Sequence, residues 1–112
     1  MSATLRAALC VAGMLLASPM LAAELQSVPP ELWDHPRSAR AVLEQPAVRA
    51  AVRAWLAQPG ARLVIHHGYG QNPLLEAEEL RLWLMALAVD AARVSLVNDV
   101  KPGDSLKIEV QP

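Results

Sequence analysis

The fold prediction rests on residues 62–97, which read RLVIHHGYGQNPLLEAEELRLWLMALAVDAARVSLV. The run 63–65 is short, apolar and rich in β-branched residues, which is typical of a buried strand, and the run 93–97 is typical of a second strand. A helix is expected between them at 73–88, because apolar residues recur there at three- and four-residue steps. These residues are Ala77, Leu80, Trp83, Leu84 and Leu87. A strand, a helix and a strand in this order normally form a parallel, right-handed unit.

The start of that helix carries its own signals. Asn72 can cap the helix, with Pro73 at the first helical position, where a missing backbone N–H does no harm. Three acids follow in the expected first turns, where the helix dipole favours negative charge. They are Glu76, Glu78 and Glu79. We therefore expect 68–73 to be a loop and the three acids to be partners of the helix dipole rather than paired catalytic carboxylates.

Two helical segments are expected upstream, at 38–45 and 46–58, since good helix formers dominate both. Pro46 suits the first position of the second helix. Its apolar side chains, Val48, Ala51, Val52 and Trp55, make one stripe, and Arg49 and Arg53 lie on the opposite, wet face. Downstream, Pro102-Gly103 is a turn signal. Apolar residues then alternate with Lys107 and Glu109 in a last strand, and the short connection favours an antiparallel hairpin with the strand at 93–97.

These elements predict an α+β fold for a single domain at residues 38–112. The expected order is helix, strand, helix, strand, strand, in a small two-layer sandwich with the helices on one face of a three- or four-stranded mixed sheet. Residues 24–37 contain three prolines and are expected to form an extended arm, which Trp33 pins to the domain.

Residues 1–23 match a secretory signal peptide. Arg6 precedes an apolar run, and small residues end at Ala23, where cleavage is expected. The alternative is a membrane anchor, but Pro19 leaves the run short of the roughly 20 apolar residues that a span needs. The sequence thus predicts a periplasmic or secreted protein with no stable membrane insertion after cleavage. The only cysteine, Cys10, lies inside the signal, so the exported domain has no disulfide.

The composition excludes some classes of protein. A content of 54% hydrophobic and 19% charged residues excludes a disordered chain. The formal net charge is −1, and all 11 acidic residues follow residue 23, so nucleic acid is not an expected partner.

A resemblance is carried by two segments, Val64-Ile65-His66-His67-Gly68-Tyr69 and Ala88-Val89-Asp90-Ala91-Ala92-Arg93-Val94. They occupy the places of a strand ending in Gly-His-Thr-Asp and of a Gly-Val-x-x-x-Arg step in the OmpA-like, peptidoglycan-associated domain family of envelope proteins. The resemblance covers about residues 41–110 and implies an envelope module of that fold.

Several residues depart from the pattern of that family. Tyr69 stands where the family has an aspartate that helps to hold the peptidoglycan peptide, and three glutamates stand where it has an arginine. Only His67 carries over, as a residue that shapes the loop. The family's first strand also has no evident counterpart, so we expect an open sheet edge through which a homodimer could form.

One cluster is the candidate ligand-binding site, at the carboxyl end of a strand and the start of a helix, where open α/β folds often place ligands. Its members are His66, His67, Tyr69, Gln71 and Asn72. Imidazole, phenol and amide groups suit a neutral polar ligand such as a sugar, and they equally suit an ordinary glycine-rich turn. No metal site is expected, because adjacent strand residues point to opposite faces and zinc needs three or four converging ligands. No cofactor and no catalytic residue is expected, since none of the serines lies in a nucleophile motif and the glycines make no dinucleotide motif.

The first functional hypothesis is a non-catalytic periplasmic accessory or adaptor module of the cell envelope, with another envelope protein as its partner. The alternative is a domain that binds a glycan or peptidoglycan fragment through the 66–72 loop.

Overall fold

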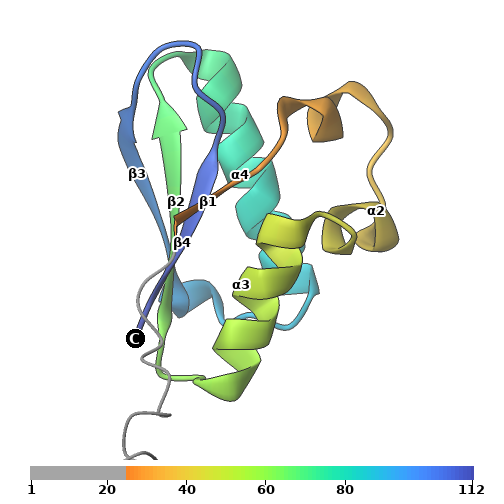
Figure 1. Ribbon diagram of the computed structural model, residues 1–112, viewed down its shortest axis with the longest axis vertical. Coiled ribbons are helices and arrows are strands. Elements are labelled where there is room, and N and C mark those ends of the chain that lie inside the picture. The colour runs from red at the N-terminus through yellow and green to blue at the C-terminus, as the bar shows by residue number, and fades with distance from the viewer. Residues whose placement is uncertain (1–24) are drawn as a thin grey trace, which may run out of the picture.

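The computed structural model describes residues 25–112 (Figure 1), so the expected signal peptide at 1–23 lies outside the described residues. The elements are β1 (Leu25–Ser27), the 3-10 helix η2 (Pro30–Asp34), α2 (Ala39–Leu43), α3 (Pro46–Ala57), β2 (Arg62–Gly68), α4 (Gln71–Ala86), the 3-10 turn η3 (Ala91–Arg93), β3 (Val94–Val100) and β4 (Lys107–Gln111). The four strands form one mixed sheet in the order β1-β4-β2-β3, and the α-helices lie on one side of it. The α+β fold class is confirmed.

The unit β2-α4-β3 forms as its sequence predicts. β2 and β3 are parallel, with Leu63 beside Val94 and Ile65 beside Leu96. Leu63 and Ile65 are fully buried under the helices, because alternate residues of a strand share one face. Both strands extend beyond the expected apolar runs, and a bulge separates His67 from Gly68 where β2 ends.

The expected hairpin between the last two strands is wrong. β4 is antiparallel, but it pairs with β2 on one side and with β1 on the other, while β3 lies on the far side of β2. The connection from Lys101 to Leu106 therefore crosses the end of β2. β2 is the most buried strand, and a strand flanked by β3 and β4 is covered on both edges, unlike a strand at the sheet edge.

The expected extended arm is only partly extended. Its first residues form β1, and η2 then follows, beginning with Pro30 at a position where proline suits a helix start. Val28 is fully buried and its backbone N–H donates to the Leu106 carbonyl at 2.8 Å. Leu32 is buried as well, so Trp33 is not the only anchor. β1 thus covers the edge of β4, and the expectation of an open edge left by a missing first strand is wrong.

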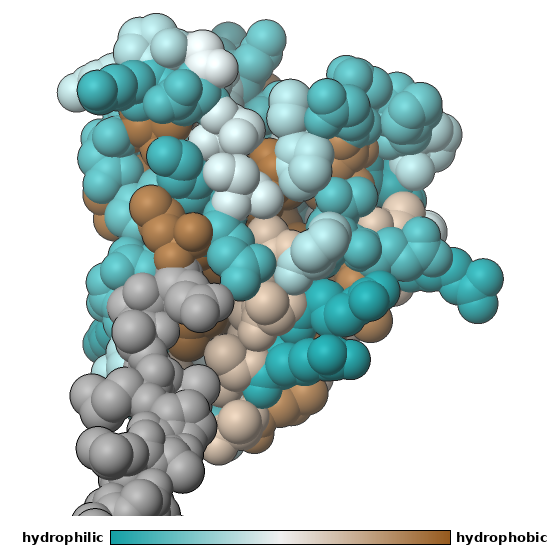
Figure 2. Space-filling view, in the orientation of Figure 1, coloured by the Kyte–Doolittle hydropathy of each residue, from teal (hydrophilic) through white to brown (hydrophobic). Residues whose placement is uncertain are grey.

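The helices before β2 agree with the sequence prediction. The Ser38 hydroxyl accepts a hydrogen bond from the Ala41 N–H at 3.1 Å and caps α2. α3 buries the expected stripe, with Trp55 partly buried at its end. Arg49 and Arg53 are exposed. Figure 2 shows polar side chains standing out from α3 on the side away from the sheet.

α4 begins two residues earlier than expected, at Gln71. Gly70, with φ of 106°, is the residue before the helix, and no side chain caps it, so the prediction that Asn72 caps the helix is wrong. A backbone with positive φ suits glycine and allows the chain to turn directly into the helix. The early start also removes the acids from the first turn, so their expected role as dipole partners is wrong too.

Candidate functional site

The structure does not bring the five candidate residues together. His66 and His67 are neighbours on β2, so their side chains point to opposite faces of the sheet. Tyr69 is 74% exposed after the strand end, and Gln71 and Asn72 are exposed on the first turn of α4. The five residues therefore form no single binding surface.

His66 lies on the sheet face opposite the described helices, between two carboxylates. Its Nδ1 is 2.8 Å from Asp99 Oδ1 on β3, and its Nε2 is 2.9 Å from Glu109 Oε1 on β4. A carboxylate can only accept hydrogen bonds, so the imidazole satisfies both partners only when both ring nitrogens carry protons. His66 therefore joins three neighbouring strands, and its doubly protonated form suits that position.

The charge of His66 follows from this geometry. Burial alone would lower its pKa, because a charged ring loses solvation. The hydrogen bonds to Glu109 and Asp99, with the attraction of both negative charges, outweigh that effect and raise the pKa of His66 above its ordinary value. Because its two nitrogens point in opposite directions toward the two acids, His66 cannot share one metal ion with both of them. Within residues 25–112, no three His, Cys, Asp or Glu side chains are placed to hold a metal ion.

His67 faces the helices and is 6% exposed. Its Nδ1 donates to the carbonyl oxygen of Gly68 at 3.0 Å, because a carbonyl can only accept. This bond lies at the bulge where β2 ends, so one ring nitrogen of His67 is bound to the backbone of the strand end.

A hollow of about 450 Å³ lies beside this strand end. The candidate loop contributes Gly68, and α4 contributes Pro73 and Glu76. The remaining lining residues are Val28, Pro30, Trp33, Gly103, Asp104, Ser105 and Leu106. The sequence interpretation missed this combination, because it joins three segments that are far apart in the chain.

The chemistry of the hollow is that of a polar site with one aromatic wall. Within the described residues, the carboxylates of Glu76 and Asp104 have no hydrogen-bond or salt-bridge partner, so both can accept hydrogen bonds. Burial raises the pKa of Glu76, and the negative charge of Asp34 adds to that effect while Arg37 opposes it. Trp33 supplies a flat apolar surface, of the kind on which sugar rings stack.

Arg37 fixes that wall of the hollow. Its guanidinium donates to both carboxylate oxygens of Glu79 at 2.7 and 2.9 Å, in the two-pronged geometry that suits arginine. It also donates to the Trp33 carbonyl at 3.0 Å and lies 5.6 Å from the Trp33 ring centre. On the other side, Trp83 donates to Glu79 at 3.1 Å. The hydrogen bond from Arg37 lowers the pKa of Glu79, which stays charged.

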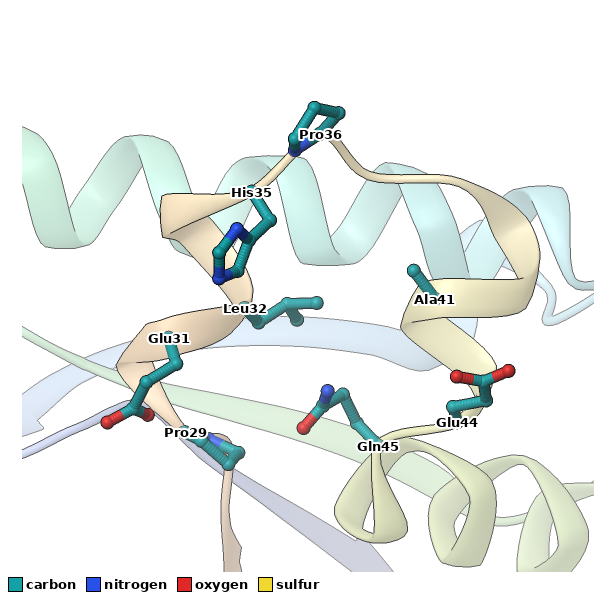
Figure 3. A pocket seen from close by; sticks show the side chains of 8 residues that line it. All are labelled: Pro29, Glu31, Leu32, His35, Pro36, Ala41, Glu44 and Gln45. Carbon is teal, nitrogen blue, oxygen red and sulfur yellow. The ribbon is translucent and has the colours of Figure 1, made fainter.

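A second hollow of about 300 Å³ separates η2 from α2 (Figure 3). The side chains of Leu32 and Gln45 point into it from opposite sides. Its polar groups are Glu31, His35, Glu44 and Gln45, all near the surface. Within the described residues none of these side chains has a hydrogen-bond partner, so the hollow is not a preorganised site.

The outer edge of β3 is the long free edge of the sheet. β3 has seven residues and, among the described strands, pairs with β2 alone, whereas β1, at the opposite edge, has three. Val97, at the middle of β3, is exposed, and Asp99 is the only charged residue of the strand. Natural sheet edges are usually protected by several charges, a proline or a covering segment. No other described strand pairs with the outer side of β3, so its backbone N–H and C=O groups can bond to another chain.

None of the helices in the described part of the chain has the length and apolar character that a membrane span requires. The resemblance to OmpA-like domains stays a prediction. Comparison of the chain with protein-family models, with curated proteins and with solved structures finds no match.

Proposed function

We propose that this chain is a non-catalytic accessory or adaptor module of the cell envelope, exported to the periplasm or beyond by its N-terminal signal. It binds an extended segment of a partner envelope protein along the outer edge of β3. The observation that carries the proposal is the free edge itself: seven residues with one charge, next to a sheet that His66 holds together across three strands. Strand addition to such an edge supplies main-chain hydrogen bonds without a deep pocket.

The first test is capture of partners from envelope extract on the exported protein. Val97→Lys places a charge at the middle of the edge and should abolish capture, as charged edge residues do in natural sheets. Val97→Thr, which keeps the β-branched shape, is the matched control and should retain the partner. The purified partner should then slow hydrogen exchange at the β3 amides. Capture that is equal for all three proteins would refute the edge as the binding surface.

Export itself is tested by the intact mass of the protein recovered from the periplasm. The mass expected is that of a chain cut next to Ala23. A mass that includes residues 1–16 would contradict export with cleavage.

The alternative function is binding of a glycan or peptidoglycan fragment at the end of β2. It is favoured by the hollow that Gly68, Trp33 and the unpaired carboxylates of Glu76 and Asp104 line. Sugar hydroxyls can donate to those carboxylates while a ring lies against Trp33. Co-sedimentation with cell-wall sacculi distinguishes the two functions, since the adaptor stays in the supernatant and the glycan binder does not.

A further inference from the structure

α4 has apolar side chains on two opposite faces. One face, made by Ala77, Leu80 and Leu84, is fully buried against the sheet and the other helices. The opposite face carries an outer stripe, which we define as Leu74, Leu75, Leu82 and Met85. Leu75 and Leu82 are 56% and 58% exposed, and their seven-residue spacing places them on one line along the helix. A helix at a protein surface normally carries polar residues on its outer face. The outer stripe is therefore an unusual surface for a helix exposed to water.

One charged residue of each sign lies beside the outer stripe. Glu78 and Arg81 lie between its leucines, and their side chains form only a loose pair at 3.8 Å. Both side chains are substantially exposed. Glu79, in contrast, points to the other flank of α4, where it binds Arg37. The stripe is thus apolar, and the two charged groups beside it pair only loosely with each other.

We propose that the outer stripe packs against the outer stripe of a second copy of the chain, with the two α4 helices antiparallel about a twofold axis. A twofold interface uses the same surface on both copies, so that surface must complement itself. In the antiparallel arrangement Glu78 faces the partner's Arg81, and Arg81 faces the partner's Glu78. Leu75 then lies between the partner's Leu82 and the partner's Met85, as ridges fill grooves in paired helices.

The charges favour a second copy over a lipid surface. Helices that lie on membranes flank their apolar face with lysine and arginine. α4 has Arg81 as its only basic residue and carries three glutamates. Anionic lipid would repel those acids, whereas a second copy supplies an arginine for each Glu78.

The dimer goes beyond the proposed function and uses other residues. The outer stripe shares no residue with the β3 edge, and α4 packs on the helix-bearing side of the sheet. Loss of partner capture by Val97→Lys and loss of the dimer are therefore separate results.

The test is sedimentation velocity of the exported protein from low micromolar to near-millimolar concentration. We expect a dimer that dissociates on dilution. Leu82→Glu should give a monomer at all these concentrations, with an unchanged circular dichroism spectrum because Leu82 is exposed. Leu56→Glu is the matched control, since Leu56 is 61% exposed on α3 and should leave the dimer intact. A parent protein that is monomeric throughout, or equal dissociation of both variants, overturns the proposal.

Charge reversal tests the antiparallel register and separates it from unspecific apolar association. In either single variant, Glu78→Arg or Arg81→Glu, the residues at 78 and at the partner's 81 carry the same charge. The twofold axis repeats this contact, so each single variant should weaken the dimer by about tenfold. The double variant restores opposite charges and should recover the parent's dissociation constant. A double variant as weak as either single variant would exclude the pairing of Glu78 with the partner's Arg81.

Discussion

His66 and Glu109 are 43 residues apart in the chain, yet the ring Nε2 of one lies 2.9 Å from the carboxylate of the other across the β2–β4 pair. With Asp99 on the opposite side, the ring spans β3, β2 and β4 on the sheet face opposite the described helices. A protonated ring donates to both acids, whereas a neutral ring leaves one nitrogen lone pair facing a carboxylate. The protonation state of His66 is therefore linked to the stability of the sheet.

The first prediction is that His66 stabilises the domain in mild acid. Its pKa is raised in the folded state, so its contribution is complete below the unfolded value of about 6.5 and is lost as pH rises through the folded pKa. Chemical denaturation of the parent and of His66→Gln at pH 5.5 and 8.5 checks this. The difference between the two proteins should be larger at the lower pH, and a difference that grows with pH would contradict it.

The second prediction concerns the end of α4. Ala88 has φ of 76°, and the bonds from Ala88 N–H to Met85 and from Val89 N–H to Leu84 form a Schellman motif, in which glycine is the usual residue. Ala88→Gly should raise the free energy of unfolding by about 0.5–1 kcal/mol, because it removes the strain of a left-handed alanine. Thermal melting should shift upward by a few degrees. A lower melting temperature would show that the greater backbone freedom of glycine in the unfolded chain outweighs the relief of strain.

The third prediction is that Trp83 is a packing residue. It is partly buried against the core rather than fully enclosed, and it donates to Glu79. Trp83→Ala should cost about 3 kcal/mol, at the lower end of the range for core tryptophans, which is a large part of the stability of so small a domain. Trp83→Phe keeps most of the packing and should cost clearly less. If Trp83→Ala has the same melting temperature as the parent protein, the packing role of Trp83 is excluded.

The fourth prediction is that Arg37 holds η2 against α4. Arg37→Ala removes the bonds to Glu79 and to two backbone carbonyls, so residues 28–38 should exchange amide hydrogen faster and be cleaved sooner by protease. Arg53→Ala, which removes an exposed arginine of α3, is the control and should leave this segment unchanged. Equal protection in both variants would mean that Val28 and Leu32 suffice to hold the segment.

The fifth prediction applies to the alternative function. If a small polar ligand binds at the end of β2, recognition is by stacking on Trp33 and by hydrogen bonds from ligand hydroxyls to Glu76 and Asp104, because no lysine or arginine lines the hollow to hold a carboxylate. Titration with neutral oligosaccharides and muropeptides should then depend little on salt. Trp33→Ala should weaken binding, and so should Tyr69→Ala if the ligand extends to the loop. Strong, salt-sensitive muropeptide binding that survives both changes would contradict this mode.

The sequence predicts those parts of the fold that depend on local patterns. The strand at 63–65, the helices at 46–58 and 73–88 and the parallel unit they form follow from periodicity, and all are confirmed within a few residues. The partner of β4 could not be predicted in this way. The short connection between β3 and β4 indicates that β4 runs antiparallel to β3. Whether β4 pairs with β3 or with β2 depends on which of the two strands must be covered on both edges.

The candidate site shows the same limit more sharply. Pattern reasoning found the loop after His67, where a strand ends and a helix begins, but it assigned both histidines to one surface although they alternate across the sheet. The carboxylates that face His66 come from positions 33 and 43 residues away, and Trp33 reaches the hollow from the segment before α2. No local spacing marks these contacts, because the strand order creates them.

The position of β4 sets the time at which this sheet can be completed. β4 is the last element of the chain, and it lies between β1, the first described strand, and β2. Neither neighbour has its partner on that side until the ribosome has added the residues from 107 onward. The sheet therefore closes through contacts between distant parts of the chain, which are the slow ones to form. A partly folded chain in which β4 has not docked exposes the facing edges of β1 and β2, to which a strand of another chain could add.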